Sequence, residues 1–286
     1  MNSSTIQLVE CPRDAMQGWE HPIPTNLKAE YINALLKAGF HSIDFGSFVS
    51  PKAIPQMADT TAVLKLLDKT ASRSALLAIV ANERGAEEAV AFDSIDYLGY
   101  PFSVSPTFQN RNTNAGIEES WIRVNRIQEI CIREKRKLVI YLSMAFGNPY
   151  GDEWNEEIVF AWAERMQAIG VPVVSLADTV GLASPEQVGK MTGHLIQHLS
   201  DTTVGVHLHS RPDNWREKLA AAWQAGCTRF DGALRGIGGC PMANDQLVGN
   251  MDTLNMIHYF DELKQHLLID RAQLQACLDI STRVFV

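Results

Sequence analysis

The sequence predicts an α/β fold, a (β/α)8 TIM barrel in which eight parallel strands close on themselves inside a ring of helices, with extra C-terminal helices. Short runs rich in β-branched residues alternate with amphipathic helical patterns along the chain, so a helix separates nearly every pair of strands. Eight such units occupy about 230 residues, which suits a closed barrel better than an open parallel sheet.

Local patterns predict the individual elements. Strands are expected at residues 5–9, 41–45, 75–80, 94–98, 138–142, 171–176, 203–207 and 228–231. Helices are expected at residues 27–36, 86–92, 117–136, 155–169, 185–199 and 214–226, and after about residue 250. Gly39 would end the first helix, and Ser184 with Gln187 would form a capping box. No linker interrupts this pattern, so we expect one domain over residues 1–286.

Composition and charge argue against several classes of function. Hydrophobic residues make up 46% of the chain and charged residues 20%, as in ordinary globular proteins. The net charge of -8, without a visible basic patch, argues against nucleic acid as a partner. The sequence contains no apolar run of about 18 residues and no signal-peptide pattern, so we expect no membrane partner and a cytoplasmic location. Five cysteines without a CxxC pair suit free thiols in a reducing compartment.

Polar residues gather where the predicted strands end, which is where barrel enzymes carry their active sites. In chain order they are Glu10, Arg13 and Asp14 after the first strand, Asp44 in the second, Asp178 after the sixth, His207 and His209 at the end of the seventh, and Cys240 and Asn250 after the eighth. Several of these charges would be costly in an apolar barrel without partners, which indicates one shared polar site.

His207 and His209 are candidate metal ligands. The period of two in their strand places both imidazoles on the face opposite its apolar side chains. Such a pair alone is as consistent with two unligated histidines as with two metal ligands. Its place at a strand end favours metal binding. Asp14 and the amide of Asn250 would complete a mixed nitrogen and oxygen site, which suits Mg²⁺ or Mn²⁺ and suits Zn²⁺ less well.

Simpler interpretations are open for the other charged residues. Asp14 and Arg13 are equally consistent with a loop cap or a surface ion pair. Asp44 and Asp178 both precede loops, so either could cap the helix that follows. On the local sequence alone, these residues are therefore candidates for structural as well as catalytic roles.

Cys240 is a candidate catalytic thiol. The surrounding segment GIGGCPMA, at residues 236–243, is too rich in glycine for the interior of a helix or strand and indicates a backbone that approaches a ligand closely. Cysteine is by default a small buried hydrophobic residue, and Cys131, Cys227 and Cys277 lie in patterns that fit this default. We therefore expect the thiol of Cys240 to be displayed.

Several segments of the chain form a recognisable set of motifs, namely VECPRDAMQ at residues 9–17, SFVSPK at 47–52 with PQM at 55–57, DTVG at 178–181, HLH at 207–209 and GIGGCPMA at 236–243. Together they resemble the hydroxymethylglutaryl-CoA lyase family of metal-dependent barrel lyases. The SFVSPK and GIGGCPMA segments are specific to that lyase, whereas the Arg-Asp pair and the HxH pair mark a wider superfamily of retro-aldol and Claisen enzymes. The match follows the chain in order over nearly its whole length.

The resemblance implies a lyase that cleaves 3-hydroxy-3-methylglutaryl-CoA, or a close 3-hydroxyacyl-CoA, to acetyl-CoA and acetoacetate in leucine degradation. It implies a divalent metal held by Asp14, His207, His209 and Asn250, with Glu10 behind them. It also implies substrate-directed roles for Arg13, Asp44, Asp178, His207 and Cys240. His207 or Asp44 would be the base, Arg13 would stabilise the enolate oxygen, and Cys240 would supply a proton. The expected partners are an acyl-CoA and further copies of the chain, in a homodimer or other homo-oligomer.

The sequence departs from the family around the expected acyl pocket. Ala15 and Met16 replace the family's Gly-Leu, Asp44 replaces a glutamate, and Ser210 replaces the aspartate after the histidine pair. The metal ligands are intact, so the reaction type is better supported than the acyl group. The alternatives are a Claisen-type synthase or a 4-hydroxy-2-oxoacid aldolase of the same superfamily, which share the ligands but lack GIGGCPMA. A zinc amidohydrolase is disfavoured because its HxH pair follows the first strand.

Overall fold

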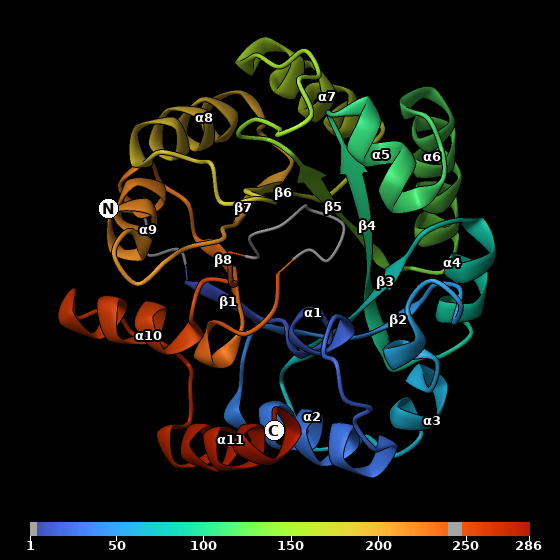
Figure 1. Ribbon diagram of the computed structural model, residues 1–286, viewed down its shortest axis with the longest axis vertical. Helices are drawn as coiled ribbons and strands as arrows, with labels where there is room; N and C mark the ends of the chain where they lie inside the picture. Colours follow the sequence, from blue (N-terminus) through green and yellow to red (C-terminus); the bar gives the residue numbers. More distant parts are fainter. Residues whose placement is uncertain (1–4, 240–247) are drawn as a thin grey trace.

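Eight parallel strands form the centre of the molecule in a computed structural model, which describes residues 5–239 and 248–286. The strands are β1 (Gln7–Glu10), β2 (Ser42–Phe48), β3 (Ala75–Val80), β4 (Ile95–Ser103), β5 (Lys137–Ser143), β6 (Val173–Ala177), β7 (Thr203–His207) and β8 (Arg229–Gly232). Each strand pairs with the next along the chain, and β8 pairs with β1, so the sheet closes. The predicted barrel and all eight of its strands are confirmed (Figure 1).

Helices surround the barrel and connect its strands. They are α1 (Pro12–Gln17), α2 (Thr25–Ala38), α3 (Thr60–Leu64), α4 (Glu83–Val90), α5 (Pro106–Thr113), α6 (Ile117–Arg133), α7 (Glu156–Ala168), α8 (Pro185–His198), α9 (Trp215–Gln224), α10 (Thr253–Glu262) and α11 (Arg271–Val284), with short 3₁₀ turns at Pro55–Met57 and Leu234–Gly236. The capping box of Ser184 and Gln187 is confirmed, and Gly39 ends α2 in the left-handed conformation at φ 83°.

Three short helices were not among those predicted, namely α1, α3 and α5. Helices of five to eight residues complete at most about two turns, so they show no recurring apolar stripe. Helix α1 is the most important of them, because it follows β1 directly and carries Arg13 and Asp14. These two residues therefore sit on a rigid helical turn rather than in a loop.

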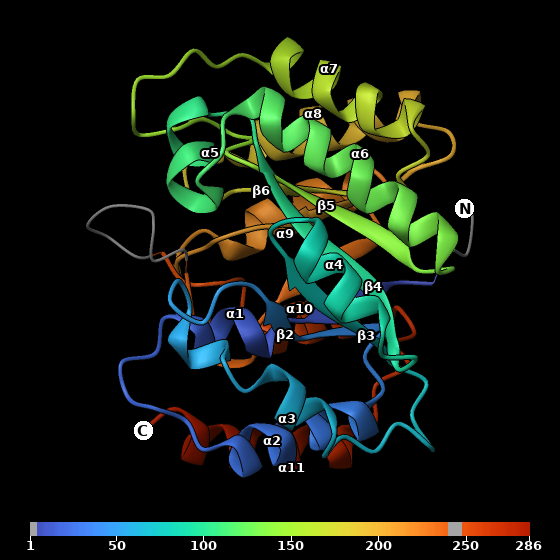
Figure 2. The same ribbon diagram turned by 90° about the vertical axis from the view of Figure 1, so that its right-hand side faces the viewer.

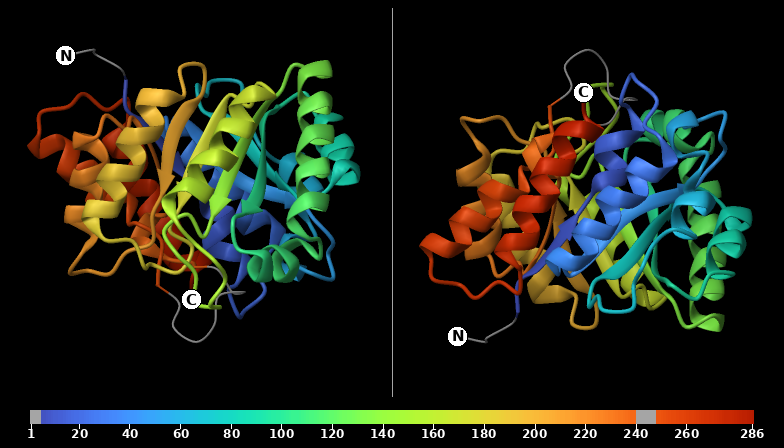
Figure 3. Two further views of the ribbon diagram at one scale, coloured as in Figure 1. Left: turned by 90° about the horizontal axis from the view of Figure 1, so that it is seen from above. Right: turned by 90° about the horizontal axis from the view of Figure 1, so that it is seen from below.

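The predicted C-terminal helices are α10 and α11. Helix α11 lies beside α2 on the outside of the barrel, at the bottom of Figure 2 and in the right-hand view of Figure 3. Just beyond α11, the ring of Phe285 packs edge-on against Trp19 and Tyr31, with ring centroids 5.2 Å and 6.2 Å apart. The C-terminal helix thus covers α2 and braces the segment that follows α1.

The barrel has a layered core. Alternate residues of each strand face outward and pack against the helices, forming the large hydrophobic cluster of the protein. The residues between them face inward, and a small separate apolar cluster joins Leu77, Ile79, Tyr97, Val139, Tyr141 and Val173 of β3 to β6. Inside the barrel on the β8 side stand charged residues instead, Arg229 and Asp231. Among the described residues, no helix is long and apolar enough to cross a membrane.

Candidate active site

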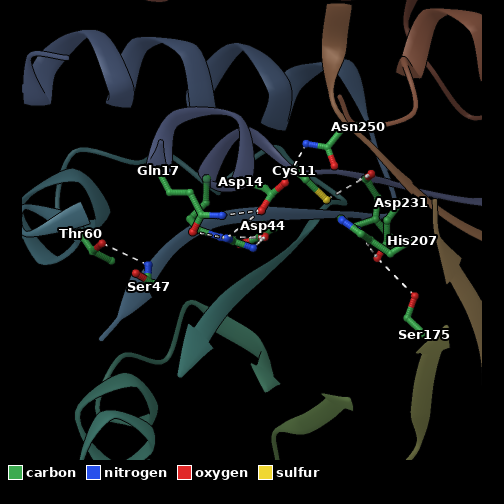
Figure 4. Close-up of polar contacts among 12 residues, drawn as sticks. Cys11, Asp14, Gln17, Asp44, Ser47, Thr60, Ser175, His207, Asp231 and Asn250 are labelled. Carbon is green, nitrogen blue, oxygen red and sulfur yellow. Dashed lines mark hydrogen bonds and ion pairs between the residues drawn. The ribbon is translucent and has the colours of Figure 1, made fainter. Parts of the chain in front are cut away.

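The predicted polar site forms beyond the ends of β1, β7 and β8 and beside the first half of β2. Asp14 comes from α1, Asp44 from β2, His207 from the last position of β7, and Asn250 from the segment that follows the loop after β8 (Figure 4). An isolated antiparallel bridge pairs Asn250 with His209, which fixes the chain after the loop against the chain after β7. The barrel topology thus brings residues from both ends of the sequence into one site.

Asp14, His207 and His209 have the spacing of a metal site, because one ligand atom of each lies within 4.8 Å of the others. Asn250 adjoins them, donating a hydrogen bond from Nδ2 to Oδ2 of Asp14 at 2.7 Å and another to the carbonyl of Ile237 at 2.9 Å. Its Oδ1 is buried and has no hydrogen-bond partner among the described residues. A buried, unpartnered carbonyl oxygen beside a carboxylate and two imidazoles fits a divalent cation, which would supply the missing partner.

The orientation of His209 also fits metal binding. Its Nδ1 lies 2.8 Å from the carbonyl oxygen of Val248, which requires the proton to be on Nδ1 and leaves Nε2 with a free lone pair. Burial, and then the neighbouring His207, lowers the pKa of His209, so its neutral form is favoured. A neutral imidazole with an unprotonated Nε2 is the form that binds a metal.

Arg13 organises the other half of the site. Its Nε and Nη2 donate to the carboxylate of Asp44, with Nε 3.0 Å and Nη2 2.5 Å from Oδ2. Its Nη1 donates to Asp14 at 3.1 Å and to Oε1 of Gln17 at 2.9 Å. Gln17 in turn donates to the same Asp14 oxygen at 2.7 Å. Gln17 was not among the predicted site residues, although the VECPRDAMQ segment that carries the resemblance contains it.

Burial and neighbouring charges shift the pKa values of the two carboxylates in this cluster in opposite directions. Burial raises the pKa of Asp44 to about 6, although the neighbouring Arg13 works to lower it. The pKa of Asp14 is lowered, because the charges of Arg13, His207 and His209 together outweigh the opposing effect of burial. Asp14 is therefore suited to remain an anionic ligand, whereas Asp44 is suited to gain and lose a proton near neutral pH.

Glu10 stands apart from this group. Its Oε1 accepts a hydrogen bond from the backbone N–H of Leu234 at 2.8 Å, and its Oε2 accepts one from the hydroxyl of Thr253 at 2.6 Å. Burial raises its pKa to about 8. The side chain thus joins the end of β1 to the turn after β8 and to the start of α10, and the structure does not bring it among the metal-ligating atoms.

Asp178 is also placed behind the site. Its Oδ2 lies 2.7 Å from Nζ of Lys218, and its Oδ1 accepts the backbone N–H of Ala183 at 3.0 Å. Lys218 also donates to the carbonyl oxygen of His209 at 3.0 Å, so the buried ion pair supports the backbone that carries this ligand. No pattern in the sequence singles out Lys218, because a lysine in an amphipathic helix normally faces solvent.

The glycine-rich segment approaches the site closely. Gly238 has φ +103°, and a Cβ there would lie 2.6 Å from Nδ2 of Asn250, 3.0 Å from Cα of Ala15 and 3.1 Å from the carbonyl oxygen of Asp14. The expected close approach is thus present, and it is made to the proposed ligand residues themselves. Cys240, the predicted proton donor, lies outside the described residues.

Asp231 is a further residue of the site that the sequence analysis did not single out. It lies in β8 on the inner face of the barrel, one residue before the strand ends, and its Oδ2 lies 3.5 Å from Nδ1 of His207 (Figure 4). Burial works to lower the pKa of His207, but hydrogen bonding to Asp231 and the charges of Asp14 and Asp231 together raise it. No motif marks an acidic residue in a short strand, so only the barrel geometry reveals this neighbour.

Comparisons with known proteins identify the family of this chain. Residues 6–281 match the HMGL-like family model. The chain is 33% identical to the (R)-citramalyl-CoA lyase of Chloroflexus aurantiacus, over 94% of this chain and 87% of that one. It is 32% identical to the mitochondrial hydroxymethylglutaryl-CoA lyase of Mus musculus, over 91% and 80% respectively.

A solved structure shows the same architecture. An HMG-CoA lyase from Acinetobacter baumannii, in complex with coenzyme A and 3-methylmalate, superimposes with a TM-score of 0.89 at 30% sequence identity, over 98% of this chain and 90% of that one. The family match spans the barrel and every described residue of the polar site. The chain therefore belongs to the HMGL-like family and is an enzyme of the oxo-acid lyase type.

Proposed function

We propose that this enzyme cleaves 3-hydroxy-3-methylglutaryl-CoA, or a closely related 3-hydroxyacyl-CoA, to acetyl-CoA and a keto acid with the help of a divalent ion. The observation that carries the proposal is the contact between the two halves of the site. Asp14 belongs to the ligand group with the two histidines and also accepts a hydrogen bond from Arg13, which is paired with Asp44. A cation site and an acid–base cluster thus share one carboxylate.

The proposed ion is Mg²⁺ or Mn²⁺, held by Asp14, His207, His209 and Asn250. One carboxylate, one amide oxygen and two imidazoles form a mixed donor set without thiolate, which suits these ions. When bound, the ion would polarise the carboxylate and hydroxyl of the substrate and so ease loss of the hydroxyl proton. The orphaned Oδ1 of Asn250 supports its inclusion, and the contacts of Glu10 make that residue a support for the site rather than a ligand.

The chain's own residues would move the protons. Asp44 is the proposed base, because His207 is taken as a metal ligand; it removes the proton of the tertiary hydroxyl, and the carbon–carbon bond breaks to give a ketone and the enolate of acetyl-CoA. Arg13 is the permanently cationic donor for the enolate oxygen, and Asp44 and Gln17 orient its guanidinium. Protonation of the enolate carbon, which the resemblance implies for Cys240, completes acetyl-CoA. Replacing Cys240 by alanine should then abolish turnover without loss of metal binding.

A second candidate substrate is citramalyl-CoA. The identity to the citramalyl-CoA lyase of Chloroflexus aurantiacus is 33%, which is no lower than the 30–32% identities to hydroxymethylglutaryl-CoA lyases. Its carboxylate is one methylene nearer the carbinol carbon, so the same bond cleavage would release pyruvate in place of acetoacetate. Asp44 is one methylene shorter than the glutamate that the resemblance implies at this position, which is a further departure from the hydroxymethylglutaryl-CoA lyases.

The test is a product assay on a panel of thioesters. The purified enzyme is incubated with 3-hydroxy-3-methylglutaryl-CoA or with either enantiomer of citramalyl-CoA, and acetoacetate and pyruvate are measured with their NADH-linked dehydrogenases. Acetoacetate from 3-hydroxy-3-methylglutaryl-CoA supports the main proposal. Pyruvate without acetoacetate would instead support citramalyl-CoA as the substrate. Release of free CoA from acetyl-CoA and a keto acid, as the new thioester is hydrolysed to the hydroxy acid, without measurable cleavage of the panel, would instead support a Claisen-type synthase.

The cellular setting follows from this chemistry. We place the enzyme in the cytoplasm, in leucine degradation, as a single catalytic unit that forms a homodimer or other homo-oligomer. The net charge of -8 is consistent with a small acyl-CoA substrate rather than nucleic acid. Light scattering of the purified protein would test the oligomeric state.

A further inference from the structure

A buried pair of opposite charges lies inside the barrel beneath His207. Arg229 and Asp231 are two positions apart on β8, so both side chains face the interior, while Phe230 between them packs outward on Phe260. Arg229 is 1% exposed and Asp231 is 2% exposed. In the parallel register, Gly205 of β7 lies opposite Arg229 and His207 lies opposite Asp231. Asp231 thus lies between the guanidinium of Arg229 and the imidazole of His207 along the barrel interior.

The barrel is shaped to accept the arginine. A Cβ at Gly205 would lie 3.0 Å from Cδ and 3.1 Å from Cγ of Arg229, so glycine on β7 leaves the space across which the arginine stem lies. Nη2 of Arg229 is 3.7 Å from Oδ1 of Asp231, and the hydroxyl of Ser175 is 3.5 Å from its Oδ2. The carboxylate of Asp231 therefore has a cation near Oδ1 and a hydroxyl near Oδ2.

The third neighbour of Asp231 is His207. Nδ1 of this imidazole is buried and lies 3.5 Å from Oδ2 of Asp231, and no hydrogen bond to another described residue competes for it. A carboxylate accepts but does not donate a hydrogen bond when it is ionised, so its proximity favours the tautomer with the proton on Nδ1. Nε2, on the opposite edge of the ring, then keeps its lone pair for the site formed with Asp14 and His209.

We propose that Asp231, backed by Arg229, is a positioning residue that fixes the tautomer and orientation of His207. This inference rests on the proposed function, because it takes His207 as a ligand. A carboxylate beyond a ligating histidine orients the ring, and removal of such an outer partner typically weakens metal binding about 10- to 100-fold. The contact at 3.5 Å is longer than an ordinary hydrogen bond, and we expect it to shorten when Nε2 is engaged.

A second metal site is the competing interpretation, because Cys11, His207 and Asp231 also offer ligand atoms within 4.8 Å of one another. Two observations disfavour it. The thiol of Cys11 donates to the backbone carbonyl oxygen of Val9 at 3.9 Å, so the sulfur already has a partner in its own segment of the chain. The guanidinium of Arg229 is a permanent cation beside the same carboxylate and would repel a second one.

The test combines a tautomer measurement with a binding measurement. In metal-free wild-type protein labelled with ¹⁵N-histidine, the spectrum of His207, assigned by its loss in His207→Gln, should show the proton on Nδ1. Asp231→Asn should lose this preference and bind Mn²⁺ 10- to 100-fold more weakly in a titration followed by electron paramagnetic resonance. Ser175→Ala, which removes the other side-chain neighbour of Oδ2, should keep the wild-type tautomer and affinity.

The outcomes separate the inference from the proposed function. A proton on Nε2 in the wild-type spectrum would overturn the role of Asp231, and that result does not depend on whether Asp231→Asn folds. Wild-type Mn²⁺ affinity and an unchanged tautomer in Asp231→Asn would overturn it as well. Absence of Mn²⁺ binding in the wild type and in Ser175→Ala would refute the proposed metal site, while the tautomer in metal-free protein would still decide whether Asp231 orients His207.

Discussion

Asn250 donates a hydrogen bond to the carboxylate of Asp14 across 236 positions of the chain, at 2.7 Å. The bond turns the other end of the amide, Oδ1, into a buried position without a hydrogen-bond partner among the described residues. It also joins the helix after β1 to the segment after β8, the two ends of the sheet where the barrel closes. The site is therefore assembled only when the barrel is closed.

Gly238→Ala should disrupt this contact. The new Cβ would lie 2.6 Å from Nδ2 of Asn250, and φ +103° is strained for alanine, so we expect Asn250 to be displaced and Mn²⁺ affinity to fall by about tenfold or more. Isothermal titration calorimetry measures the change. Gly116→Ala is the matched control, since a Cβ there meets no heavy atom within 4 Å. Equal Mn²⁺ affinity in both variants would show that Gly238 does not constrain the site.

Arg13→Lys should lose turnover while the site persists. Lysine keeps the charge but cannot reproduce the guanidinium contacts to Asp44, Asp14 and Gln17. Loss of a donor to the enolate oxygen typically lowers kcat about 10²- to 10³-fold. Steady-state kinetics and bound metal are compared with Arg126→Lys, an exchange on an exposed helix surface. Near-wild-type kcat in Arg13→Lys would reassign Arg13 to a structural ion pair.

Lys218→Met tests the support behind His209. Removing the lysine leaves the carboxylate of Asp178 buried without its cation, and breaking such a pair costs about 3–5 kcal/mol of unfolding free energy. Urea denaturation followed by circular dichroism measures the loss. Lys190→Met, which removes an exposed partner of Glu156, should leave the urea midpoint unchanged. A stable Lys218→Met protein with impaired kcat would instead restore a substrate-directed role for Asp178.

Stability should depend on pH through His41, which lies at the opposite end of the barrel from the site. Burial, followed by the charges of Arg229 and Lys137, lowers the pKa of His41 from 6.5 to about 4 in the fold. Between these two values the unfolded chain binds the proton and the folded chain does not, so this residue's contribution to stability is lost as pH falls from about 6.5 to 4. His41→Gln should therefore lose less unfolding free energy than the wild type between pH 7 and pH 5. Parallel losses in both proteins would contradict the assignment.

Regular patterns in the sequence predicted the barrel well. The strands are largely buried runs rich in apolar residues, and the longer helices carry an apolar stripe, so both kinds of element are visible locally. Helix α1 was missed because six residues hold too few turns for such a stripe. The local signals for this helix lie at its ends, because Pro12 begins it and Gly18 follows it.

The site was predictable only where side chains follow strand ends. That rule, together with the resemblance, placed Asp14, Asp44, His207 and Asn250 in one region, and the structure brings them together. It could not distinguish residues that face the site from those behind it, such as Asp178 with its partner Lys218. Pairings between distant segments depend on register and side-chain direction, and these arise only when the sheet closes.

The central claim is metal-dependent cleavage of a 3-hydroxyacyl-CoA at the site of Asp14, His207, His209 and Asn250. The most direct test is the rate of acetoacetate release from 3-hydroxy-3-methylglutaryl-CoA by metal-stripped enzyme, before and after addition of Mg²⁺ or Mn²⁺. We expect no release from the stripped enzyme, full recovery on addition of either ion, and no recovery in His209→Ala. Full activity in metal-stripped enzyme would contradict the account.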